Sequence, residues 1–249
     1  MNQPLDFSKS NLRADIQGLR AIAVALVLLF HFGGITEGGY LGVDMFFVIS
    51  GFVITQSTIR EIRETSTFSW RNFLKRRVRR LLPGAAVVLA FTAVAALIFL
   101  SPFGPQQETA RMIVGAATYS TNFLLMPRGY FAIESGSNPL LHFWSLAVEE
   151  QYYLLFPYFI LLLNPRSYKG LFIAMIIIGI GTRIGFTLFA DHSMKESNWM
   201  WWYVNPFSAL DCFGVGGILA YMFHYKQVFF QSMKYLMPGL IISMIFFWI

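Results

Sequence analysis

The sequence predicts an all-α membrane protein, namely a polytopic transmembrane helical bundle with a basic amphipathic helix on the cytoplasmic surface. Of its 249 residues, 56% are hydrophobic and only 13% are charged, whereas soluble globular domains carry about 25% charged residues. The apolar residues form long runs separated by short clusters that hold nearly all the Lys and Arg. This alternation is expected when each run must cross hydrocarbon. One membrane domain over residues 1–249 accounts for the whole chain.

Seven apolar segments are close to the ~20 residues that a helix needs to cross a bilayer. They are Leu19–Phe32, Tyr40–Ile59, Leu82–Leu100, Leu141–Leu163, Leu171–Ala190, Pro206–Phe223 and Tyr235–Ile249. The first follows a polar N-terminus and has no small-residue cleavage site, so we expect a retained span rather than a signal peptide. The last ends at Ile249 without a polar flank, which predicts that the chain is truncated at its C-terminus.

Segment Glu108–Met126 is long enough to be an eighth crossing but is rich in polar side chains. Lys and Arg are enriched in cytoplasmic loops near the ends of spans. With seven spans and a cytoplasmic N-terminus, only Arg111, Arg128 and Lys195 lie in outside loops. An eighth span would weaken this asymmetry, so the segment is predicted to lie at or beyond the outer surface.

Charge and motifs exclude several classes of function. The net charge of +6 does not predict nucleic-acid binding, because basic residues of membrane proteins retain loops in the cytoplasm and contact lipid headgroups. The single Cys212 permits no intramolecular disulfide. The chain lacks a G-x-S-x-G elbow, a Walker loop, an H-E-x-x-H metal motif and a dinucleotide fingerprint. We therefore expect membrane lipids as partners, and neither nucleic acid nor metal.

The first predicted span carries Arg20 and His31, eleven residues apart. Eleven helical residues return to within roughly 20° of the same face, ~16 Å further along the axis. Ionisable residues in a span normally face a bundle interior or a wet cavity. An imidazole titrates near neutral pH, so His31 can take a proton from an attacking hydroxyl. An interfacial role for His31 explains the spacing equally well, and Arg20 either anchors the cytoplasmic end or binds a phosphate.

The second span begins with Gly42-Val43-Asp44 and enters from the outer side, where His31 is also expected. The carboxylate of Asp44 can therefore fix the tautomer of His31 and support its charged form. A dipole partner for the N-terminus of this helix is the alternative.

A basic run from Phe68 to Pro83 follows, with apolar residues at helical spacing among cations that include Arg77 and Arg80. It predicts the amphipathic helix on the cytoplasmic surface. Such a cluster anchors lipid headgroups or receives the phosphates of a nucleotide-bearing donor. The pattern alone favours the anchor.

The fourth span contains the adjacent carboxylates Glu149 and Glu150, with His142 on the face of Glu149. Helical neighbours diverge by about 100°, so the two carboxylates cannot face the same point. At least one is expected to face the interior. Catalytic support and a structural ion pair with Arg183 of the fifth span are both open.

Four motifs follow one another along the chain: residues 17–24 leading to His31, residues 42–52, the basic run ending at Pro83, and residues 142–151. In this order they resemble the membrane-bound acyltransferase 3 family, which includes O-acetyltransferases of lipopolysaccharide and other surface polysaccharides. The similarity covers most of residues 12–160 and is weaker beyond. Gln17 stands where many relatives have Asp, and it is assigned no role.

The resemblance implies an enzyme of the bacterial inner membrane that transfers groups other than amino-acyl groups. Its members move an acyl group, acetyl from acetyl-CoA in the O-acetyltransferases, from cytoplasmic acyl-CoA to a hydroxyl of an extracytoplasmic glycan such as lipopolysaccharide O-antigen or exopolysaccharide. By this resemblance His31 is the catalytic base or acyl carrier, and Asp44, Glu149 and Glu150 support it. The residues implied for acyl-CoA binding are Arg20, Arg77 and Arg80. Similar members have further spans and often an SGNH-type domain.

Two functions of other classes remain open. Buried charges of this kind also relay protons or bind anions in a membrane transporter or flippase. A non-catalytic membrane anchor or assembly partner is the third hypothesis.

Overall fold

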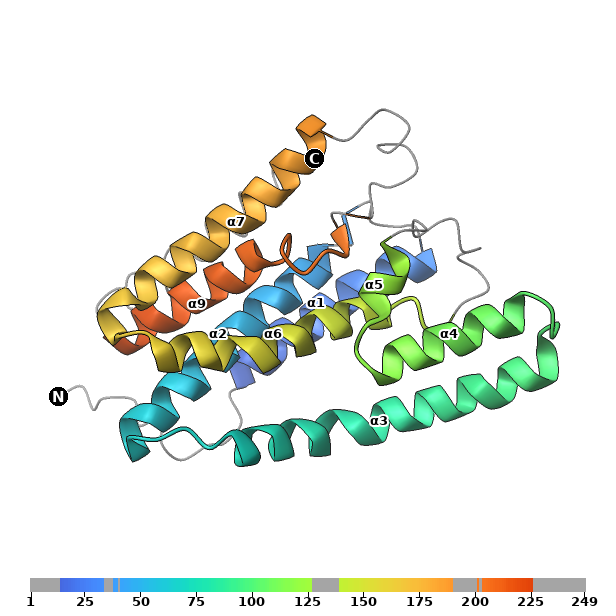
Figure 1. Cartoon of the computed structure of the whole chain (residues 1–249), viewed down its shortest axis with the longest axis horizontal. Coiled ribbons are helices and arrows are strands. Elements are labelled where there is room, and N and C mark those ends of the chain that lie inside the picture. The colour runs from blue at the N-terminus through green and yellow to red at the C-terminus, as the bar shows by residue number, and fades with distance from the viewer. Residues whose placement is uncertain are drawn as a thin grey trace.

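The computed structural model describes residues 14–33, 38–39, 41–126, 139–189, 201 and 203–225. Within these residues the fold is helical and contains no strand, which confirms the all-α prediction. The helices, shown in Figure 1, are α1 (Ala14–Gly33), α2 (Leu41–Thr65), α3 (Trp70–Phe99), α4 (Pro105–Ala117), α5 (Thr121–Leu125), α6 (Phe143–Leu162), the 3₁₀ turn η1 (Pro165–Ser167), α7 (Tyr168–Phe189) and α9 (Leu210–Tyr225).

Four candidate membrane spans are found in the described part of the chain: Ala14–His31 in α1, α2, α3, and Pro165–Leu188 across η1 and α7. They agree with four of the predicted crossings and identify a membrane protein. Predicted spans Leu141–Leu163 and Pro206–Phe223 correspond to α6 and α9. These two helices are not among the four candidate spans of the described residues. The predicted span Tyr235–Ile249 lies outside the described residues.

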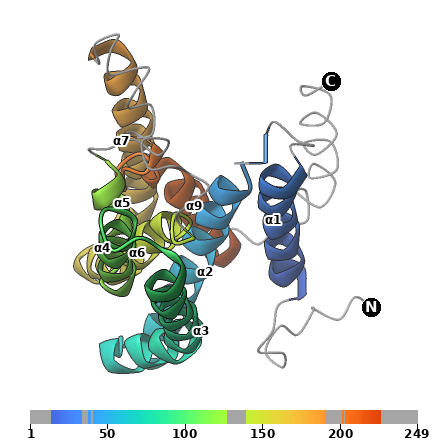
Figure 2. The same ribbon diagram turned by 90° about the vertical axis from the view of Figure 1, so that its right-hand side faces the viewer.

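Helix α2 is the centre of the bundle. Half of its span is buried (50%), against 11% for α1 and for α3, and it packs against α1, α6 and α9. Figure 2 shows α1 at one edge of the bundle, with α7 on the far side of α9. Gly216 of α9 lies so close to α2 that a Cβ there would overlap the carbonyl of Val48. Small residues therefore let the two central helices approach closely.

The polar segment Glu108–Met126 forms two short helices rather than a span. Helix α4 has 13 residues and α5 has 5, and Tyr119 between them has a φ of 51°. At ~1.5 Å per residue, α4 is ~20 Å long, which is less than the ~30 Å of the hydrocarbon core. Buried Asn122 accepts a 2.9 Å hydrogen bond from the Gln151 amide, which holds α5 against α6.

The basic run does not form a separate amphipathic helix. It forms the first turns of α3, a single helix of 30 residues that continues through Pro83. The predicted surface helix of the basic run and the predicted span Leu82–Leu100 are therefore one continuous helix. Proline disfavours a helix interior, but membrane helices tolerate it when neighbouring groups compensate. The cytoplasmic location of this segment stays a prediction.

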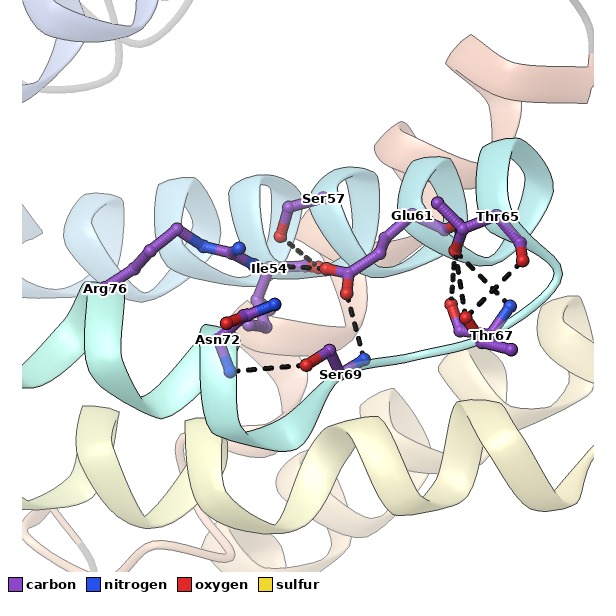
Figure 3. Close-up of polar contacts among 8 residues, drawn as sticks. All are labelled: Ile54, Ser57, Glu61, Thr65, Thr67, Ser69, Asn72 and Arg76. Carbon is purple, nitrogen blue, oxygen red and sulfur yellow. Dashed lines mark hydrogen bonds and ion pairs between the residues drawn. The ribbon is translucent and has the colours of Figure 1, made fainter.

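The turn between α2 and α3 fixes the start of α3. Figure 3 shows that Glu61 accepts a 2.9 Å hydrogen bond from the Ser69 backbone N–H and pairs with the Arg76 guanidinium at 3.1 Å. The Ser69 hydroxyl in turn accepts from the Asn72 N–H at the first turn of α3. One carboxylate of α2 therefore sets where the arginine-bearing face of α3 lies.

Candidate functional site

His31 lies in the last turn of α1 with its ring exposed. Its Nδ1 is 2.8 Å from the carbonyl oxygen of Val27. Because a carbonyl can only accept, Nδ1 carries the hydrogen, and in the neutral ring Nε2 carries the free lone pair. This is the tautomer that a general base needs, with Nε2 available to an incoming hydroxyl.

The ring next to His31 is His142, which precedes α6. The two ring centroids are 4.7 Å apart with the ring planes tilted by 49°. His142 is exposed as well, so a group that reaches one imidazole also reaches the other. The sequence placed His142 on the face of Glu149 but gave it no role, because its pairing with His31 joins residues distant along the chain.

A second polar cluster joins α1, α3 and α6. Arg20 interacts electrostatically with Arg77, Arg80 and Glu149, and Glu150 interacts with Arg77 and Arg80. Three guanidinium groups and two carboxylates thus lie within electrostatic range of this site, with a summed formal charge of +1. A partly buried cluster with excess positive charge favours an anionic ligand. The residues predicted to bind a donor therefore lie together, and Glu149 and Glu150 lie with them.

The two clusters lie at two levels of the same pair of helices. Arg20 and His31 are eleven residues apart on α1, and His142 and Tyr153 have the same separation at α6. His31 contacts His142, and Arg20 interacts with Tyr153. Since eleven helical residues rise ~16 Å, the imidazole pair and the arginine cluster are separated by about that distance.

Hydrogen bonds fix Glu149 within the arginine cluster. Its Oε1 accepts from the Ser50 hydroxyl at 2.5 Å and from the Tyr153 hydroxyl. The Arg77 guanidinium lies over the ring of Tyr153, 3.5 Å from the centroid. Among the described residues, neither Glu149 nor Glu150 forms an ion pair with an arginine. Neither Ser50 nor Tyr153 was predicted; the available signal was that Tyr153 follows Glu149 by one helical turn.

A pocket of about 260 Å³ opens beside this cluster, between α3, α6 and the turn after α4. Arg77, Glu150 and Tyr153 line it together with mainly apolar side chains of α3. The buried Oε1 of Glu150 has no hydrogen-bond partner. The pocket therefore offers a cation and an apolar wall to a ligand.

Asp44 does not join His31 in this structure. Its carboxylate interacts electrostatically with Arg183 and Asp211. Arg183 pairs with Asp211 at 3.2 Å and donates to the Ser208 carbonyl at 3.3 Å. The structural alternative in which Arg183 pairs with a glutamate of α6 is therefore not observed. Asp211 was not predicted, since its spacing to Arg183 becomes meaningful only when α7 packs on α9.

Comparisons with known proteins agree with the motifs. The family model described as an acyltransferase domain matches residues 13–249. A protein of Staphylococcus aureus strain MSSA476, provisionally named an O-acetyltransferase, is 35% identical over 198 residues, which are 75% of this chain and 32% of that protein. "O-acetyltransferase OatA" of S. aureus strain NCTC 8325 is 36% identical over 179 residues, 68% of this chain and 29% of that protein. The chain thus spans about a third of the length of these relatives. No solved structure matches the chain.

Proposed function

Since this chain belongs to the family of the acyltransferase domain, we propose that it forms the membrane part of an O-acyltransferase. The enzyme transfers an acyl group, acetyl in the first instance, from cytoplasmic acyl-CoA to a hydroxyl of an extracytoplasmic glycan. Lipopolysaccharide O-antigen and exopolysaccharide are acceptors of this class. We propose further that the protein lies in the bacterial inner membrane with its N-terminus in the cytoplasm. The "O-acetyltransferase OatA" name of a relative supports the acetyl group.

The single observation that carries this proposal is that a cluster suited to bind an anion and a histidine suited to act as a base lie on the same helix, α1. The net positive cluster of Arg20, Arg77 and Arg80 suits the phosphates of acyl-CoA, because guanidinium groups bind phosphate through a planar fork of donors. His31 lies ~16 Å away along the helix axis. The extended pantetheine arm of acyl-CoA spans such a distance, so a donor held by its phosphates presents its thioester near His31.

Transfer then needs one proton to move. In the direct route, Nε2 of His31 takes the proton of the acceptor hydroxyl while its oxygen attacks the thioester carbonyl. The C–S bond breaks as the new ester C–O bond forms, and the imidazolium returns the proton to the CoA thiolate. In the alternative route Nε2 attacks the thioester carbonyl and the C–S bond breaks, which gives an acyl-imidazolium and CoA thiolate; the acceptor hydroxyl then attacks the acyl carbon, the C–N bond breaks, and the proton of the hydroxyl neutralises the thiolate. His142 is placed to share the proton in either route. Asp44 interacts with Arg183 and Asp211 instead of His31, and Glu149 and Glu150 lie with the arginine cluster, so we assign none of the three the role of base.

The test is His31→Ala, with His31→Gln as the polar control, in the complete protein. Both variants are expected to insert into membranes normally and to abolish acylation of the surface glycan, measured as loss of the acyl mass increment. The base and acyl-carrier roles both need the basic lone pair of an imidazole nitrogen; alanine has no side-chain nitrogen, and the amide nitrogen of glutamine only donates hydrogen bonds. Normal acylation in either variant would refute the proposed chemistry.

A further inference from the structure

The carboxylate of Glu149 is held by two buried hydroxyl groups. Ser50 of α2 and Tyr153 of α6, each 1% exposed, donate to the same oxygen, Oε1. We call these two donors the hydroxyl clamp. They come from different helices, and Tyr153 is also part of the buried hydrophobic core. The lone pairs of Oε1 are therefore occupied from two directions.

The clamp explains why Glu149 is not paired with an arginine. The carboxylate interacts electrostatically with Arg20, and a guanidinium and a carboxylate that are free to rotate form a charge-assisted pair. No such pair involving Glu149 occurs in the described part of the chain. The carboxylate oxygen Oε1 is instead held by the two hydroxyl donors.

Tyr153 also orients one of the arginines. The Arg77 guanidinium lies 3.5 Å from the centroid of its ring, which is a cation–π contact. Among the described residues Arg77 forms no ion pair with a carboxylate, so its N–H donors are available to a phosphate. The ring of Tyr153 thus contacts Arg77, and its hydroxyl restrains Glu149.

We propose that Ser50 and Tyr153 are positioning residues that keep the Arg20, Arg77 and Arg80 cluster open to an anionic donor. Without the clamp, Glu149 turns toward the guanidinium groups and competes with the phosphates of acyl-CoA. This inference rests on the proposed use of acyl-CoA. It assigns Glu149 a conditional effect: its charge weakens donor binding only when the hydroxyl donors are lost.

The neighbouring Tyr152 provides a matched control. It is buried on the same helix but stacks on Phe213 of α9, with ring centroids 3.9 Å apart. Its hydroxyl lies near Thr55, away from the arginine cluster. A tyrosine-to-phenylalanine change at either position keeps the ring and removes one buried hydroxyl. Only the change at Tyr153 frees Glu149.

The experiment measures the dissociation constant for CoA, and kcat and KM with acetyl-CoA, using the complete protein in lipid nanodiscs. Tyr153→Phe and Ser50→Ala are each expected to weaken CoA binding and raise KM by about tenfold, the effect of one hydrogen bond to a charged group, with kcat unchanged. Tyr152→Phe should match the unsubstituted protein. Adding Glu149→Gln to Tyr153→Phe should restore CoA binding, because an amide does not compete with the phosphates.

The outcomes separate the two proposals. If the unsubstituted protein does not bind CoA, the acyl-CoA donor is wrong and this inference falls with it. If that protein binds CoA but Tyr153→Phe and Ser50→Ala bind it equally well, the donor stands and the clamp is refuted. A fall in kcat with unchanged CoA binding, or failure of Glu149→Gln to restore binding, would assign Tyr153 a structural role and also overturn the clamp.

Discussion

Substitution of Gly216 by alanine tests whether close contact between α2 and α9 holds the bundle together. A Cβ at this position would overlap the Val48 carbonyl and lie 2.6 Å from the amide nitrogen of Phe52. Both obstacles are backbone atoms of α2, so no side-chain rotation relieves the clash. The helices must separate, which is expected to reduce stability by the ~1–3 kcal/mol typical of overpacking, nearer the upper end because the backbone is rigid.

The control is Gly181→Ala in α7, where no atom lies within 4 Å of the added Cβ. Both substitutions gain the helix propensity of alanine, about 1 kcal/mol, so their difference isolates the clash. Gly181→Ala should therefore raise the midpoint of thermal unfolding in detergent, and Gly216→Ala should lower it. Equal shifts in the two variants would refute the packing argument.

Two further predictions concern other contacts. His142→Phe keeps a ring next to His31 but removes the second imidazole. We expect kcat for acyl transfer to fall while KM for acyl-CoA stays unchanged. An unchanged kcat would show that His142 takes no part in proton transfer. Glu61→Gln weakens the pair with Arg76, which is partly exposed. We therefore expect the free energy of unfolding to fall by less than about 1 kcal/mol. We also expect KM for acyl-CoA to rise, because the first turn of α3 is no longer held by the carboxylate. Arg71→Gln, an exposed change on the same helix, is its control.

The helical architecture was predictable because the hydropathy and charge of each segment depend only on neighbouring residues in the sequence. The apolar runs located the helices, and the polar content of Glu108–Met126 kept it from being counted as a span. The basic run and the apolar run Leu82–Leu100 were predicted as separate segments because their compositions differ, yet they form the single helix α3. The contacts that let a membrane helix continue through a proline are not visible in sequence.

The candidate site was predictable only in part. Helical periodicity placed Arg20 and His31 on one face, and the family resemblance selected Arg77 and Arg80. Nothing local indicated that Asp44 would lie with Arg183 and Asp211 rather than with His31, because that choice depends on the packing of α2 against α9 and of α9 against α7. The contacts of Ser50 with Glu149 and of His142 with His31 could not be predicted for the same reason, since each joins two helices distant along the chain.

Helix α2 explains how these separate contacts act on one site. On this helix Asp44 interacts electrostatically with Arg183 and Asp211. Further along it, Ser50 donates a hydrogen bond to Glu149 and Glu61 pairs with Arg76. From Asp44 to Ser50 the helix rises ~9 Å, and from Ser50 to Glu61 a further ~16 Å. These contacts reach α9, α6 and α3 in turn, and α1 packs along the same helix. The rise along α1 sets the distance between the imidazole pair and the arginine cluster, and both α1 and α6, which carry residues of both, pack against α2. A shift of α2 along its axis would therefore displace both groups of residues together.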